Sequence, residues 1–110
     1  MKPDKVLAMI GMAARAGNVA SGEFSTEQAV KKGKACLVVT ASDASENTKK
    51  HFSDMCSYRQ IPYFEYAQKE QLGNWIGKEY RASLAVTDQN LAKEVIRRFK
   101  ELEQLNHGGN

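Results

Sequence analysis

Short apolar runs alternate with segments of helical spacing along most of the chain, and this alternation restricts the possible folds strongly. "ACLVVT" at residues 35–40 is a continuous run of apolar and β-branched residues, and "SLAVTD" at residues 83–88 contains another over residues 84–87. Such runs are typical of strands that are covered on both faces of a sheet. "IPYFEY" at residues 61–66 begins near a proline, which suits the start of a strand. We therefore expect strands at these three positions, of which those at residues 35–40 and 83–88 are covered on both faces.

The segments between the strands carry apolar residues at helical intervals. The expected helices cover residues 4–15, 22–32, part of 42–60, 68–76 and 89–105. A short extended link at residues 18–22 joins the first helix to the second. In the third segment, Asp43 and Glu46 have the spacing of a capping box, which predicts that Asp43 begins that helix.

This order of elements predicts an α/β fold. Helices and strands that alternate with short connections pack as a three-layer α/β/α sandwich, here with a mixed sheet of about four strands. The chain has 110 residues, enough for one compact domain. We expect a single domain over residues 1–105 and a flexible C-terminal tail, "NHGGN", over residues 106–110.

Charge and cysteine content restrict the functional classes. The formal net charge of +3 is compatible with a polyanionic partner. Cys36 and Cys56 lack the C-x-x-C spacing, and with only two histidines in the chain we expect no metal site. Buried, reduced thiols are the preferred interpretation, and they favour a reducing compartment such as the cytoplasm.

Membrane insertion and secretion are not expected. No stretch approaches the roughly 20 apolar residues that a membrane span requires. The first residues imitate a secretion signal in part, but Asp4 and Arg15 interrupt its flanks. An amphipathic first helix explains them better.

Enzyme motifs are missing from the sequence. There is no phosphate-binding loop, no dinucleotide fingerprint and no nucleophile elbow. Asp43 and Asp88 follow apolar strands, at the edge where open α/β sheets bind ligands. Capping of the helices that follow them is the competing explanation. Because no nucleophile is paired with a base, we expect neither catalysis nor a cofactor.

Basic residues gather at two places. One group ends the helix at residues 22–32, and the other lies in a short loop before the last strand. The two groups are Lys31, Lys32 and Lys34, and Lys78 and Arg81. If the helix and the loop lie side by side, these residues form one positive rim suited to phosphates. A solvated helix end is the alternative, because lysines favour the negative pole of the helix dipole.

The start of the second helix is a further candidate site. Gly22 precedes it, so the backbone amides of Glu23, Phe24 and Ser25 are expected to be free for phosphate or acceptor groups. Phe24 could stack on a base or belong to the core. Tyr80, between charges in the loop, is a better stacking candidate, whereas Trp75 is expected in the core.

Several short motifs occur in one order and spacing. They are Gly22, "AVKKGKACLVV" from residue 29, "ASDAS" from residue 41, "IPY" from residue 61, "LG…IGKE" over residues 72–79 and "AVTD" from residue 85. Together they resemble the kink-turn RNA-binding ribosomal protein family (the L7Ae and L30e superfamily), and within it the bacterial YlxQ-type members. The resemblance covers nearly the whole chain.

The resemblance implies a binding protein rather than an enzyme. Members of this family have an α/β/α fold and grip a sharply bent RNA with the start of the second helix and the loop before the last strand. The implied partners are structured RNA, of kink-turn or ribosomal type, and the ribosome or another ribonucleoprotein. The implied RNA-binding residues are Gly22, Glu23, Phe24, Ser25, Gln28, Lys31, Lys32, Lys34, Lys78, Glu79, Tyr80, Arg81 and Ala82.

The sequence departs from the family at its guanine-reading motif, Gly-x-Asn-Glu. Phe24 and Ser25 stand where asparagine and glutamate are usual, and Gln28 replaces a lysine. Each bidentate base contact contributes about 1–3 kcal/mol of discrimination, by analogy with duplex readout. We therefore expect RNA binding to be kept better than recognition of an ordinary kink turn. A protein-interaction module on the same fold is the alternative.

Overall fold

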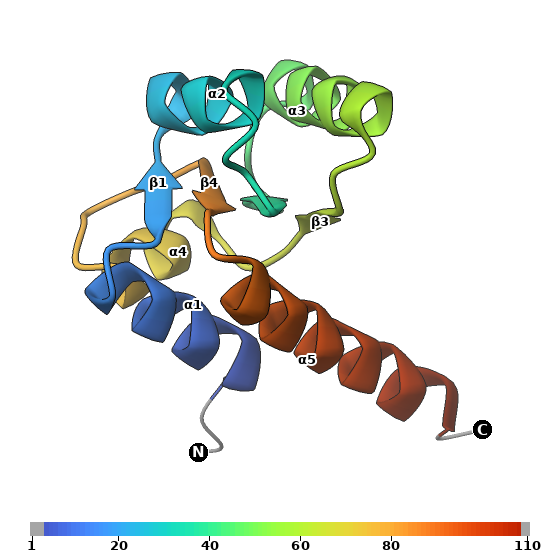
Figure 1. Ribbon diagram of the computed structural model, residues 1–110. Helices are drawn as coiled ribbons and strands as arrows, with labels where there is room; N and C mark the ends of the chain where they lie inside the picture. The colour runs from blue at the N-terminus through green and yellow to red at the C-terminus, as the bar shows by residue number, and fades with distance from the viewer. Residues whose placement is uncertain (1–3, 109–110) are drawn as a thin grey trace.

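The computed structural model describes residues 4–108, with side chains described over residues 4–105. Helices and strands alternate along this part of the chain, as expected. They are α1 (Lys5–Arg15), β1 (Val19–Ser21), α2 (Glu23–Lys31), β2 (Leu37–Thr40), α3 (Glu46–Arg59), β3 (Tyr63–Glu65), α4 (Lys69–Trp75), β4 (Ser83–Val86) and α5 (Gln89–Gly108). Figure 1 shows α2 and α3 above the sheet and α1 and α5 below it, so the predicted α/β sandwich is confirmed.

The four-stranded sheet has the strand order β1-β4-β2-β3 and mixed directions. β4 runs antiparallel to both β1 and β2, whereas β3 runs parallel to β2. Val86 at the end of β4 pairs with Val19 and with Leu37, so β4 lies between two partners. The predicted mixed sheet is therefore confirmed.

Each strand of the sheet centre faces two separate apolar clusters. Leu37 and Val39 of β2 pack with α1, α4 and α5, and Val38 packs with α2 and α3. β4 divides in the same way, with Leu84 on one side and Ala85 on the other. Both faces of these strands are covered, which explains why their sequences are continuously apolar rather than alternating.

The elements are bounded somewhat differently from the prediction. β2 and β4 lack two residues at one end of the predicted ranges 35–40 and 83–88, and β3 is shorter than 61–66. α5 continues to Gly108, beyond its expected end at residue 105 and into the expected tail at 106–110. Residues 109 and 110 of that tail lie outside the described residues. End residues of elements are the least determined by local pattern, since their hydrogen-bond partners lie elsewhere in the fold.

Aspartates cap several helices, but the predicted capping box of α3 is wrong. Ser45 is the N-cap of α3 and accepts a hydrogen bond from the Thr48 amide at 3.1 Å. The Asp43 carboxylate instead accepts from the amide of Lys69, the first residue of α4, at 2.8 Å. Asp88 does cap α5, as expected, with 2.9 Å to the amide of Leu91.

The two cysteines are free thiols. Cys56 is buried, and burial raises its pKa to about 11. Cys36 is half-buried, and its pKa is raised by burial and, to a lesser extent, by the charge of Asp88. In the part of the chain that the structure describes, no helix is long and apolar enough to cross a membrane.

Candidate nucleic-acid interface

The start of α2 lies directly beside the start of β4. The amide of Gly22 donates a hydrogen bond to the Ser83 carbonyl at 2.9 Å. Next to it, Arg81 Nε donates to Ser21 Oγ at 3.0 Å, across 60 positions of the chain. Gly22 has φ +91°, a conformation that glycine adopts without strain. The loop before β4 and the beginning of α2 therefore form one continuous surface, as the family resemblance implies.

The loop over residues 76–82 is fastened to α4 by main-chain hydrogen bonds. The amide of Lys78 donates to the Gly73 carbonyl at 2.7 Å, and Gly77 turns the chain with φ +78°. Further along, the amide of Arg81 donates to the carbonyl of Lys69 at 3.1 Å. The loop is thus held at both of its ends and presents its side chains from a fixed base.

The first amides of α2 are available to a ligand. Within residues 4–105, no side chain accepts a capping hydrogen bond from these amides, and Gly22 at the N-cap position has no side chain that could do so. The side chains of Glu23, Phe24 and Ser25 are exposed, while Thr26 behind them is buried. N–H groups at a helix start carry the positive end of the helix dipole and favour anions.

Two exposed aromatic rings belong to the two segments, Phe24 to the start of α2 and Tyr80 to the loop. Phe24 is 73% exposed and Tyr80 is 63% exposed, so of the two roles open to Phe24 the structure excludes the core. Trp75 was expected in the core, and this prediction is wrong, since its side chain is 39% exposed. It lies at the last residue of α4, where only part of the indole is covered. Spacing alone does not reveal this exposure.

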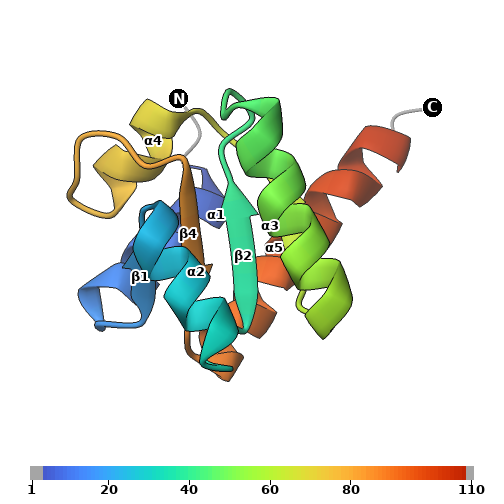
Figure 2. The same ribbon diagram turned by 90° about the horizontal axis from the view of Figure 1, so that it is seen from above.

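The lysine cluster lies at the other end of α2. Gly22 meets Ser83 at the beginning of β4, whereas Cys36, just after the cluster, donates its amide to Val86 at the end of β4. Figure 2 shows α2 running along β4, with the loop before β4 at the end where α2 begins. A helix of nine residues spans roughly 14 Å. The expected single rim of Lys31, Lys32, Lys34, Lys78 and Arg81 is therefore not formed.

Acidic residues moderate the positive charge at both places. Lys31 pairs with Glu27 at 3.1 Å, and this hydrogen bond lowers the pKa of the Glu27 carboxyl. His51 Nε2 also approaches Glu27, at 3.5 Å. At the other end of α2, Glu23 and Glu79 formally offset Lys78 and Arg81. The surface at the helix start thus offers hydrogen-bond donors and aromatic faces rather than a strong net charge.

The remaining predicted site residues are placed by the same geometry. Gln28 is half-buried one turn beyond Phe24, and Ala82 is half-buried just before β4. Lys78 and Glu79 are exposed in the loop. Among the described residues, no group of three or more histidine, cysteine, aspartate or glutamate side chains is placed to hold a metal ion.

Comparison with known proteins identifies the family of the chain. The chain belongs to the Ribosomal protein L7Ae/L30e/S12e/Gadd45 family, whose sequence model matches residues 4–96. It is 41% identical over 88 residues to "RNA-binding protein YlxQ" of Bacillus subtilis (strain 168), covering 80% of this chain and 88% of that protein. It is 39% identical over 90 residues to "RNA-binding protein YlxQ" of Enterococcus faecium, covering 82% and 86%. The family resemblance predicted from the sequence is confirmed.

Two solved structures have a similar fold. A protein with unknown function from Bacillus halodurans C superposes with a TM-score of 0.86 at 34% identity, covering 89% of this chain and 99% of that chain. The Giardia lamblia 15.5kD RNA binding protein gives a TM-score of 0.77, covering 92% and 87%. At 22% identity, the second similarity supports the shared fold alone.

Proposed function

We propose that this chain is a non-enzymatic RNA-binding protein that docks a structured RNA of the kink-turn type with the start of α2 and the loop at residues 78–82. The observation that carries the proposal is the contact between these two segments, made by Arg81 with Ser21 and by Gly22 with Ser83. The names of two relatives at about 40% identity, both RNA-binding proteins, support it.

Hydrogen-bond donors at this surface suit phosphate oxygens. The amides at the start of α2 point out of the helix end, and Arg81 stands next to them. A guanidinium has five N–H donors. Arg81 uses two groups within the protein, Nε on Ser21 and Nη1 on the Tyr80 carbonyl at 2.7 Å. These bonds hold the guanidinium in place and leave its remaining donors for an RNA phosphate, where bidentate binding is strong.

Stacking supplies the second part of the proposed recognition. A bent RNA exposes unpaired bases at its bulge, and such bases stack on aromatic side chains. Phe24 at the start of α2 and Tyr80, the residue before Arg81, are both exposed, so they are the rings of these two segments that an unpaired base can reach. With Phe24 and Ser25 in place of asparagine and glutamate, we propose that guanine edges are read weakly. The protein would then select its target RNA by the shape of the kink and by its unpaired bases. We place this interaction in the cytoplasm, within the ribosome or another ribonucleoprotein.

The test is RNA binding over a salt series with three probes: a kink-turn RNA, the same sequence as an unbent duplex, and a single strand. The unchanged protein should prefer the kinked RNA, and its affinity should fall with salt. Phe24→Ala and Arg81→Ala should each weaken binding about 10-fold, from the contributions of base stacking and charged hydrogen bonds. Arg97→Ala is the matched control, because Arg97 lies on α5 and pairs with Glu94 at 2.9 Å. Equal affinity for all three RNAs, or insensitivity to both interface variants, would refute the proposal.

A protein-interaction module is the second candidate. It is favoured by the replaced asparagine and glutamate and by the formal cancellation of charge between Glu23, Glu79, Lys78 and Arg81. Co-purification before and after RNase treatment separates the two candidates. Partners that stay bound without RNA, and that are lost in Phe24→Ala, favour the module. Partners that leave with the RNA favour the first proposal.

A further inference from the structure

A second exposed aromatic site lies between α1 and α4, away from the lysine cluster. Gly11 of α1 is buried, and a Cβ built on it would lie 2.8 Å from the Trp75 carbonyl oxygen and 3.5 Å from the indole carbon Cε3. The same position is 3.6 Å from Arg15 Nη1. The missing side chain at residue 11 therefore lets the indole lie on α1, and the guanidinium of Arg15, one helical turn further on, borders the same position.

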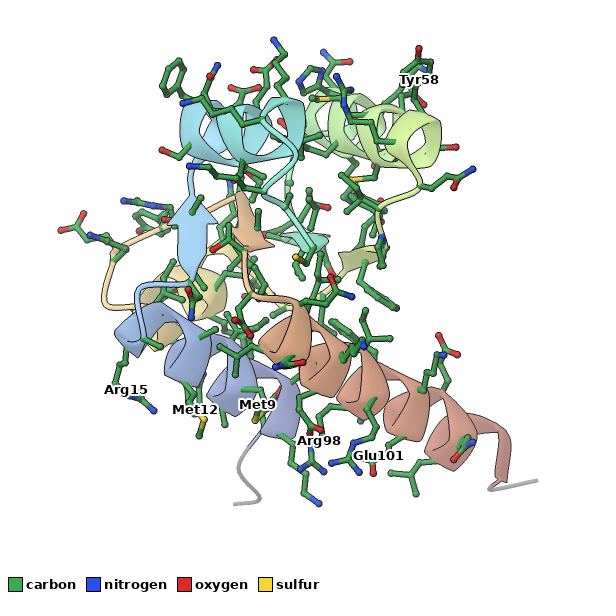
Figure 3. The ribbon with its side chains drawn as sticks, in the orientation of Figure 1. Met9, Met12, Arg15, Tyr58, Arg98 and Glu101 are labelled. Atoms are coloured by element: carbon green, nitrogen blue, oxygen red, sulfur yellow. The ribbon has the colours of Figure 1, made fainter. Side chains whose placement is uncertain are left out.

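An open depression of about 270 Å³ lies at this place, lined by Arg15, Asn74 and Trp75. Because the depression is open, a ring bound there would lie on the surface rather than inside an enclosed pocket. Arg15 is exposed, and within residues 4–105 no carboxylate lies in ion-pair range of it. Figure 3 shows the Arg15 side chain leaving the end of α1 and pointing away from the body of the protein.

The three lining groups specify one ligand chemistry. An indole face binds a flat ring by stacking, and a guanidinium binds an anion through paired N–H donors. An amide such as that of Asn74 can both donate to and accept from the edge of a base. A flat, hydrogen-bonding ring joined to an anion is a nucleotide. The absence of a carboxylate among the three lining residues argues against a cationic ligand.

The depression also continues the surface already described. Trp75 ends α4, and the loop at residues 76–82 follows it at once. That loop turns back on Gly73 through the amide of Lys78 and then reaches Ser21 through Arg81. We propose that Trp75, Arg15 and Asn74 form a second nucleotide site, which takes one unpaired nucleotide of the single strand that leaves the docked RNA. This inference rests on the proposed RNA-binding function.

Trp75 is the only tryptophan of the chain, so its fluorescence reports this site directly. The first measurement is titration of the full chain with single-stranded hexa-adenylate at low salt. Binding should quench the fluorescence, and Arg15→Gln should weaken the quenching titration several-fold. An unchanged indole signal at saturating RNA would overturn the inference, whatever the kinked RNA does.

The second measurement uses three kink-turn RNAs: one is blunt-ended, and the other two carry a single strand of six adenines at one end or at the other. The extended RNA should bind about 10-fold more tightly, as expected for one stacked base. Trp75→Ala should remove this advantage and leave the affinity for the blunt RNA unchanged. If the advantage persists in Trp75→Ala, the second site is refuted while the first survives.

Controls keep the test independent of folding. Trp75→Phe retains a ring on Gly11 and should keep part of the advantage of the extended RNA, whereas Trp75→Ala should lose it. Circular dichroism melting establishes that each variant is folded at the temperature of the titration. Failure of the blunt RNA to bind, together with quenching by hexa-adenylate, would refute docking at the α2 site and with it the shared binding of one RNA, leaving Trp75 as a separate single-strand site.

Discussion

The main chain of Glu79 lies against Gly73 so closely that no larger residue fits between α4 and the loop. A Cβ at Gly73 would be 2.5 Å from the Glu79 carbonyl oxygen and 2.9 Å from the amide nitrogen of Tyr80. These neighbours are backbone atoms, which cannot move aside as a flexible side chain can. Gly73 therefore sets the position of the loop that carries Tyr80 and Arg81.

Gly73→Ala should displace this loop. We expect a loss of about 1–3 kcal/mol in the free energy of unfolding, from overpacking, and a fall in affinity for kinked RNA. Gly33→Ala is the control, because Gly33 has φ +74° but nothing within 4 Å of its Cβ position. It should lower stability through backbone strain and leave RNA binding intact. Urea unfolding and RNA titration measure the two effects, and wild-type RNA affinity in Gly73→Ala would contradict the prediction.

The carboxylate of Asp43 should stabilise α4 rather than α3. Asp43→Ala removes its bond to the Lys69 amide and should cost about 1 kcal/mol, the typical value of a helix cap. Asp43→Asn keeps an acceptor oxygen and should cost less. Hydrogen exchange locates the effect: amides of α4 should exchange faster in Asp43→Ala, while those of α3, capped by Ser45, should not. If exchange became faster in α3 alone, Asp43 would cap α3 in solution, as the sequence predicted.

Alkaline pH should destabilise the fold through Cys56. Its pKa is raised from 9.0 to about 11, so folding favours the neutral thiol. The contribution is complete below pH 9 and is lost as pH rises toward 11. We expect a loss of about 2 kcal/mol between pH 8 and pH 10.5, measured by urea unfolding.

Two variants assign this pH dependence. Cys56→Ala should remove most of the loss of stability at alkaline pH. Cys36→Ala should leave most of that loss in place, because Cys36 is only half-buried. Tyr63, whose pKa burial raises to about 12, adds to the loss above pH 10 in every variant. The same slope in Cys56→Ala and the unchanged protein would show that the thiol is not responsible.

Salt should distinguish the lysine cluster from the helix start. Lys32 lies about one length of α2 from Arg81, roughly 14 Å by helical rise, and electrostatic screening at 0.15 M salt acts over about 8 Å. Lys32→Ala should therefore weaken RNA binding less than about twofold at 0.15 M salt but several-fold at 0.01 M. Arg81→Ala should weaken it about 10-fold at both. An equal loss for both variants at 0.15 M would mean that Lys32 contacts a phosphate directly.

The layers of the fold were predictable from the sequence. Residues 35–40 and 83–88 each contain an unbroken apolar run, at residues 37–39 and 84–86, because β2 and β4 are covered on both faces, and this property is visible in a local run of residues. The helix start at Gly22 was predictable for a similar reason. Gly22 and the free amides that follow it lie within one turn of each other in the sequence. The same holds for the cap of α5, where Asp88 accepts a hydrogen bond from the amide of Leu91, three residues later.

Relations between distant segments were decided only by the tertiary structure. Asp43 was free to cap α3 nearby or α4 across 26 positions, and the packed position of α4 selects the latter. β1 runs antiparallel to β4, so the end of β1 lies beside the start of β4 and Gly22 lies next to Ser83. This strand direction decides that the start of α2, and not its end, meets the loop before β4. The exposure of Trp75 depends on Gly11 of another helix. Local spacing encodes burial and caps within a few residues, whereas strand direction and helix contacts arise from the packing of the whole chain.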